Sequence, residues 1–254
     1  MRWIMKISPQ FLALALGMGL CSTLPLRAAE PASPEAAAQA RLHGKQFRTV
    51  TVAVADHVAT LSGSVDLYAA KADAERRVRK ASGVKAVRNL ITVAGASVPD
   101  AQLEAKLSRE LAYDRVGYGN VFNAIELRVT NGVVYLTGHA RTYVDKDSAL
   151  ALVAYTQGVK DVVDAVEVDP VSGMDDRTRM AVARAVYGYP SLNRYAIDPA
   201  KPIRITVQNG HVELSGVVDS ESDRNVAFLE ANAVPGVFSV TNHLRVAGKP
   251  VEHP

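Results

Sequence analysis

Apolar and polar residues alternate in three stretches of the chain, and each stretch contains a turn at the same place. The stretches align without gaps over residues 51–63, 126–138 and 204–216. Strict alternation predicts strands with one buried face. The pairs Asn131–Gly132 and Asn209–Gly210 are typical of two-residue hairpin turns, because both central residues of such a turn need a positive φ. The first copy has Asp56–His57 there, and we expect its hairpin to depend on the flanking alternation.

A second pattern follows each hairpin at a constant distance. Each stretch closes with a glycine, and another glycine comes twenty residues later, followed by Val and, three positions on, by a second Val. Between the glycines the first copy has apolar residues at helical spacing, from Leu67 to Ala81, which predicts a helix. A third strand is expected over residues 90–93, 165–168 and 243–246. We interpret the glycines of the pattern as structural: Gly63, Gly83, Gly132, Gly138, Gly158, Gly210, Gly216 and Gly236.

A further helix is expected before the hairpins. Residues 100–113 and 175–187 have the spacing and start signals of helices, and residues 34–42 are a shorter, alanine-rich equivalent. Each unit therefore reads αββαβ, with a right-handed crossover that places the last strand parallel to the second. We predict an α/β fold of the α+β sandwich type, with three mixed strands and two helices on one face. The units are residues 29–97, 98–172 and 173–248, and about 75 residues is near the lower limit for a self-sufficient core.

The first 28 residues have the features of a secretory signal peptide. Arg2 and Lys6 precede a short apolar run, and Leu26-Arg27-Ala28 offers a small residue at the exit. The run is too short to span a bilayer, which needs about 20 apolar residues. Lipidation of Cys21 is a minor alternative. Cys21 is the only cysteine, so the mature chain is expected to have no disulfide, thiolate metal site or cysteine nucleophile.

The repeated pattern resembles a known family. The hairpin Asn-Gly-x-Val-x-Leu-(Ser/Thr)-Gly, the helix, and then Gly-Val-x-x-Val-x-Asn-x-Leu-x-Val resemble the BON domain, and copies two and three match nearly throughout. Copy one matches over residues 50–93 and departs from the pattern at its first helix. The resemblance implies a periplasmic or envelope setting, an association with stress responses, and a non-catalytic role in attachment to phospholipid membranes or to partner proteins. The resemblance implies no catalytic site in this chain.

Composition and motifs exclude several classes of function. Apart from the leader the chain has equal numbers of basic and acidic residues, so a global basic footprint for nucleic acid is absent. The six histidines show no metal-ligand spacing such as His-Glu-x-x-His, and no nucleotide-binding loop or Gly-x-Ser-x-Gly motif occurs. We expect no enzyme activity, no cofactor, no metal site and no membrane span in the mature chain.

Charge is unevenly distributed among the units. Residues 29–97 contain ten basic and six acidic residues, residues 98–172 contain seven and eleven, and the remainder is balanced. The excess in the first unit is concentrated in its crossover helix, where Asp73–Arg77 and Glu75–Arg79 have favourable spacing and Lys71, Arg76 and Lys80 are left unpaired. This helix is interpreted as a contact for anionic phospholipid headgroups. A solvated helix face and a contact between the oppositely charged first and second units are the alternatives.

Two further features suggest contacts between units or with a partner. Residues 149–155 contain no charge, which favours docking of that helix against a neighbouring unit. Tyr118 and Phe122 precede the second hairpin and are candidates for lipid or partner contact, although they could instead pack on their own core. The sequence therefore predicts an exported envelope binding module that associates with membrane lipid or an envelope protein. The alternative is a protein–protein interaction scaffold without lipid affinity.

Overall fold

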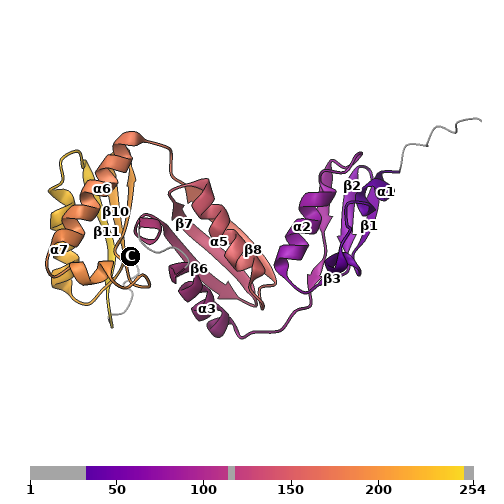
Figure 1. Cartoon of the computed structure of the whole chain (residues 1–254), viewed down its shortest axis with the longest axis horizontal. Coiled ribbons are helices and arrows are strands. Elements are labelled where there is room, and N and C mark those ends of the chain that lie inside the picture. Colours follow the sequence, from indigo (N-terminus) through magenta and orange to yellow (C-terminus); the bar gives the residue numbers. More distant parts are fainter. Residues whose placement is uncertain (1–32, 114–117, 249–254) are drawn as a thin grey trace, which may run out of the picture. The chain divides into compact units, whose positions relative to one another are not determined.

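The computed structural model describes residues 33–113 and 118–248, which form three successive α/β units (Figure 1). We call them repeat 1 (residues 33–97), repeat 2 (98–172) and repeat 3 (173–248). The predicted leader, residues 1–28, lies outside the described residues. In each repeat a β-hairpin is followed by a crossover helix and a parallel third strand, so the predicted fold class is confirmed.

Repeat 2 has a sheet of three continuous strands. Its elements are α3 (Asp100–Tyr113), α4 (Tyr118–Val121), β6 (Ala124–Thr130), β7 (Val133–Ala140), α5 (Tyr143–Tyr155) and β8 (Asp161–Val168). The central strand β7 pairs antiparallel with β6 and parallel with β8. The chain passes from β7 to β8 through α5, as the predicted crossover requires.

Repeat 3 has the same order of elements. They are α6 (Gly173–Gly188), the 3-10 helix η2 (Asn193–Ala196), β9 (Arg204–Gln208), β10 (His211–Val218), α7 (Glu221–Asn232) and β11 (Ser239–Val246). The central strand β10 pairs antiparallel with β9 and parallel with β11. Helix α6 belongs to this core, because Val182, Ala183 and Val186 pack with the strands of repeat 3.

Repeat 1 is the most interrupted copy. Its elements are α1 (Pro34–Gln39), the 3-10 helix η1 (Lys45–Phe47), β1 (Thr51–Ala55), β2 (Val58–Ser62), β3 (Ser64–Val65), α2 (Tyr68–Val78), β4 (Ala86–Asn89) and β5 (Thr92–Val93). β2 pairs with β1 and β4, and β3 pairs with β5. Backbone hydrogen bonds from Leu90 to Leu61 and from Thr92 to Gly63 continue the parallel pairing across the gap.

The third strands begin earlier than predicted. Pairing starts at Ala86, Asp161 and Ser239, about four residues before the expected starts. The valine three positions after each Gly-Val pair is a strand residue, as in Val162 of β8 and Val240 of β11. Its apolar side chain packs against the core, which extends the sheet to residues before the predicted strands.

The three hairpin turns share one backbone conformation. Asn131 and Gly132 have φ of 56° and 78°, and Asn209 and Gly210 have φ of 51° and 77°, which confirms the positive-φ turns predicted there. Asp56 and His57 adopt the same conformation, so the first hairpin has this turn without a glycine. The other glycines of the pattern also have positive φ: Gly63, Gly83, Gly138, Gly158, Gly216 and Gly236.

Each core lies between the helices and one face of its sheet. In repeat 2, Leu103 and Leu107 of α3 and Val153 of α5 pack with Val134 and Leu136 of β7. Side chains two apart on a strand share a face, so both helices cover the same side of the sheet. Equivalent clusters occur in repeats 1 and 3.

Candidate functional site

Most basic residues of repeat 1 lie on α2 and in the segment that follows it, as far as β4. On α2, Asp73 accepts hydrogen bonds from Arg77 at 2.7 Å and from Arg76 at 2.5 Å, and Glu75 accepts one from Arg79 at 2.5 Å. The predicted pairs Asp73–Arg77 and Glu75–Arg79 are confirmed. The expectation that Arg76 is unpaired is wrong, because a residue three positions after Asp73 also reaches its carboxylate.

Lys71 is also paired, contrary to expectation. Its Nζ lies 3.0 Å from Oδ2 of Asp161 in repeat 2. The partner is distant in sequence, so helical spacing could not have found it. The same ammonium lies 5.9 Å from the ring centre of Tyr68, which packs against the repeat 2 core. Burial, and secondarily the Asp161 carboxylate, raises the pKa of Tyr68. These contacts support the alternative in which the oppositely charged first and second units meet.

In the ion pairs of α2 the arginine side chain is more exposed to solvent than its carboxylate partner. The side chain of Arg76 is 72 % exposed and that of Asp73 is 20 % exposed. For Arg79 and Glu75 the values are 64 % and 32 %. Lys80, Lys85 and Arg88 are also exposed. Arg88 points to the sheet face opposite α2, because its neighbours Val87 and Asn89 face the core and α2. We call Arg76, Arg79, Lys80 and Lys85 the basic surface of repeat 1.

The two aromatic candidates before the second hairpin have different outcomes. The side chain of Tyr118 lies outside the described part of the structure. Phe122 is 1 % exposed and packs in the hydrophobic cluster of repeat 3. Phe122 is therefore not available to a lipid surface in this structure. It belongs to repeat 2 by sequence, but its side chain packs in the core of repeat 3.

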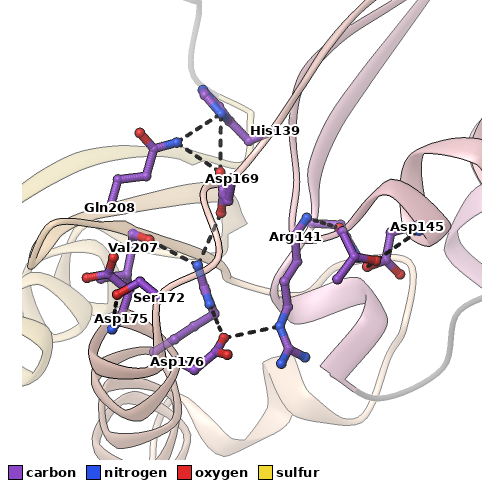
Figure 2. Close-up of polar contacts among 12 residues, drawn as sticks. His139, Arg141, Asp145, Asp169, Ser172, Asp175, Asp176, Val207 and Gln208 are labelled. Carbon is purple, nitrogen blue, oxygen red and sulfur yellow. Dashed lines mark hydrogen bonds and ion pairs between the residues drawn. The ribbon is translucent and has the colours of Figure 1, made fainter.

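A polar cluster accompanies Phe122 where repeats 2 and 3 meet (Figure 2). Arg179 of α6 donates hydrogen bonds to Asp169 at 3.1 Å, to Asp176 at 2.6 Å and to the carbonyl oxygen of Val207 at 3.0 Å. Its guanidinium also lies 5.9 Å from the ring centre of Phe122. The side chains of Arg179 and Asp169 are only 3 % and 2 % exposed.

Neighbouring side chains extend this cluster. Gln208 donates to Asp169 at 2.9 Å, Nδ1 of His139 lies 3.5 Å from Oδ1 of Asp169, and Arg141 lies 3.3 Å from Asp176 (Figure 2). A buried, paired charge cluster of this kind positions one repeat against the next. Sequence reasoning missed it, because Arg179 has the spacing of an ordinary charged residue on an amphipathic helix.

The described residues offer no catalytic arrangement that we can assign. Within residues 33–113 and 118–248, no group of three His, Cys, Asp or Glu residues is placed to hold a metal ion. The same part of the chain contains no helix with the length and apolarity needed to cross a bilayer. The perturbed groups have structural partners. Burial raises the pKa of Tyr187, whose hydroxyl donates to the Ile203 carbonyl oxygen, and it raises that of Tyr195, which contacts Asp223.

Comparison with known proteins identifies the repeats. Residues 35–95, 99–170 and 190–248 each match the BON domain. The chain is 26 % identical over 187 residues to osmotically-inducible protein Y of Escherichia coli (strain K12), covering 73 % of this chain and 91 % of that protein. It is 27 % identical over 125 residues to an uncharacterized protein in the gshII 5′ region of Anaplasma centrale, covering 48 % of this chain and 83 % of that protein.

A solved structure also aligns with this chain. It is the C-terminal domain of CdsD, a structural protein of the type III secretion system of Chlamydia trachomatis. The identity is 15 % and the TM-score is 0.24, with 85 % of this chain and 98 % of that chain covered. No functional conclusion is drawn from a likeness of this size.

Proposed function

Because the chain belongs to the BON domain family, we propose that it is a non-catalytic protein of the cell envelope that attaches to anionic phospholipid membranes through repeat 1. The basic surface of repeat 1 is the observation that carries the proposal. Arg76 of α2 and Arg79 directly after it are more exposed than the carboxylates that they pair with. Lys80 and Lys85 are also exposed, and they form no ion pair with a described carboxylate.

The expected affinity of this surface is modest. A basic residue near an anionic leaflet contributes about 1 kcal/mol, and the effect falls off within a Debye length. Because Arg76 and Arg79 are partly neutralised by Asp73 and Glu75, the contribution of Lys80 and Lys85 dominates, about 2 kcal/mol together. Attachment of this strength is reversible and depends on salt. Stable attachment would need several chains, or several contacts of one chain, on the same membrane.

The envelope setting and a role in stress are supported by the relatives. One similar protein is named osmotically-inducible protein Y, and the charged and apolar pattern of residues 1–28 has the features of an export signal. We propose that this chain acts in the periplasm during envelope stress, peripheral to a membrane. Its role there is binding rather than chemistry.

Vesicle co-sedimentation tests the lipid proposal directly. The full chain without residues 1–28 is mixed with vesicles of phosphatidylcholine alone or with added phosphatidylglycerol. We expect sedimentation with the anionic vesicles only and its loss when salt is raised from about 0.05 to 0.5 M, where the Debye length shortens severalfold. The variant Arg76→Glu, Lys80→Glu, Lys85→Glu should not sediment. The matched control Arg109→Glu, Arg177→Glu, Lys201→Glu reverses three other exposed charges and should retain binding.

The outcomes separate the two functional classes. Equal losses in both triple variants would mean that net charge, not the basic surface of repeat 1, determines binding. No sedimentation of the parent protein with anionic vesicles would overturn the lipid proposal. The protein–protein scaffold without lipid affinity would then be the favoured function.

A further inference from the structure

Strand β6 of repeat 2 has an unpaired edge. Among the strands of the described residues, β6 pairs only with β7 and is the outer strand of its sheet. Thr130 and Val133 flank the two-residue turn and therefore form a hydrogen-bonded pair. Hydrogen-bonded pairs alternate along an antiparallel ladder, so residues 124, 126, 128 and 130 direct their backbone N–H and C=O groups to β7. Ile125, Leu127 and Val129 therefore direct theirs outward. Val129 confirms this geometry, because its N–H donates to Oε2 of Glu104 at 2.9 Å.

The corresponding edges of the other repeats are occupied. In repeat 1 the Gln39 side chain accepts from the Val52 N–H at 3.2 Å and donates to the Val50 carbonyl oxygen at 3.5 Å. In repeat 3 the three central residues of β9 are all buried, and Arg179 donates to the Val207 carbonyl oxygen. Beyond Val129, no described side chain hydrogen-bonds to the outward backbone groups of β6.

A polar hollow runs along this edge. It has a volume of about 700 Å³, within the range of ligand pockets, and it is lined by residues 125–130, by α3 and by two arginines of repeat 3, Arg204 and Arg245. The α3 side contributes Leu111 and Ala112, and Arg128 of β6 joins the arginines.

The hollow has three arginines and two glutamates in its lining. None of Arg128, Arg204 and Arg245 forms an ion pair with a described carboxylate. Burial lowers the pKa of Arg204, the Glu126 carboxylate opposes that shift, and the like charge of Arg245 adds to it. Glu104 and Glu126 also line the hollow, but Glu104 is engaged with Val129. The electrostatic complement of this site is a carboxylate.

We propose that the edge of β6 and the three arginines form a docking groove for an extended acidic peptide segment of another protein, which adds to the sheet as a strand. The outward N–H and C=O groups of Leu127 provide main-chain hydrogen bonds, as in other strand-addition sites. Alternate side chains of an added strand point to opposite faces. One set faces Leu111 and Ala112, and the other faces the arginines, which bind carboxylates by charge-assisted hydrogen bonds. This inference is independent of lipid attachment.

Fluorescence anisotropy tests the proposal with a defined probe. The probe is a labelled peptide of about ten residues, the length of a long strand, in which Glu alternates with Val. Leu127→Pro removes an outward N–H without removing a bond to β7, and Arg128→Gln with Arg245→Gln removes two exposed charges. We expect each variant to raise the Kd for the Glu-Val peptide at least about tenfold. A peptide in which Gln replaces Glu should bind the parent protein with a Kd raised to a similar extent, because it lacks the carboxylates. The control Arg88→Gln removes an exposed charge from the sheet of repeat 1 and should leave the Kd unchanged.

Hydrogen exchange provides the second measurement. Binding of the Glu-Val peptide should slow exchange of the Leu127 amide and leave the Val52 and Ile205 amides unchanged. This readout on the parent protein holds even if Leu127→Pro fails to fold. Absence of peptide binding, an unchanged Kd in the double arginine variant, or protection elsewhere than at β6 would each overturn the proposal. Competition by inorganic phosphate equal to that by the peptide would show an anion site without strand addition and would also overturn it.

Discussion

The carboxylate of Asp175, in the first turn of α6, accepts a hydrogen bond from the backbone N–H of Gly210 at 2.9 Å. It also accepts one from Asn209 at 3.0 Å. The first helix of repeat 3 is thereby joined to the turn of its hairpin. Repeat 2 has the same arrangement, in which Asp100 accepts from Asn131 and Gly132. A two-residue turn with positive φ directs two adjacent N–H groups to one side, where a single carboxylate binds both.

Stability of repeat 3 is expected to depend on the charge of Asp175. Burial alone raises the pKa of Asp175, but the hydrogen bonds from Gly210, Asn209 and Ser172, together with Arg179, outweigh it and lower the pKa below its ordinary value. A group whose pKa is lower in the folded state stabilises the fold above its unfolded pKa, about 3.9. That contribution is lost as the pH falls through the lower, folded value.

Asp175→Asn should therefore destabilise repeat 3 at neutral pH by about 1–3 kcal/mol. The difference from the parent protein should shrink as the pH is lowered below about 4. Urea unfolding at pH 7 and at pH 3 measures both. Asp147→Asn, at an exposed position on α5, is the control and should have little effect at either pH. A difference between parent and Asp175→Asn that is the same at both pH values would contradict the role of the charge.

Gly138→Ala tests the close approach of the hairpin strands in repeat 2. Gly138 has a φ of 90°, and a Cβ there would collide with the backbone carbonyl oxygen of Ala124 on the paired strand. Backbone strain of this kind costs about 1–3 kcal/mol, and the collision adds to it. The control Gly188→Ala lies at the end of α6 with open space around it. Thermal unfolding should show a lower Tm for Gly138→Ala only; equal Tm values would refute the constraint.

Local structure was predictable from sequence because each element has a local signal. The positive-φ turns follow from Asn131–Gly132 and Asn209–Gly210, and α3 begins at Asp100 as its start signal indicates. The early start of β8 at Asp161 was not predicted, although Val162 is part of the repeated pattern and its side chain packs against the core.

Contacts between repeats had no such local signal. Lys71 pairs with Asp161, ninety positions away, and Phe122 packs in the core of the following repeat. The unpaired edge of β6 also depends on tertiary structure, because β6 and β9 have similar patterns and differ in what covers them. Periodicity identifies which face of an element is buried. It does not identify the repeat against which that face packs.

Phe122→Ala is expected to weaken the coupling of repeats 2 and 3. Phe122 is almost fully buried, and Arg141 and Arg179 each lie 5.9 Å from its ring centre. Truncation of a buried Phe costs about 3–5 kcal/mol. Denaturant unfolding should show this loss in the transition of repeat 3. Phe238→Ala, at a position that is 77 % exposed, should change stability by less than about 1 kcal/mol; equal effects of the two substitutions would contradict the placement of Phe122.

The buried Arg179–Asp169 pair provides a prediction for a double-mutant cycle. Removing one partner of a buried ion pair leaves an uncompensated charge and costs about 3–5 kcal/mol, whereas replacing both with apolar residues is often close to neutral. Asp169→Leu leaves the Arg179 guanidinium with Asp176 and the Val207 carbonyl oxygen, and Arg179→Met leaves Asp169 with Gln208 and His139. Each single variant should lose several kcal/mol of unfolding free energy.

The double variant should lose less than the sum of the two, with a coupling of about 1–3 kcal/mol. Urea unfolding of the parent protein, both single variants and the double variant completes the cycle. Arg109→Met with Asp147→Leu is a matched control, because both residues are exposed and should show no coupling. Additive losses for Arg179 and Asp169 would mean that the two charges do not stabilise each other. The position of α6 would then depend on its apolar contacts in the repeat 3 core and on the hydrogen bonds of Asp175 to the hairpin turn.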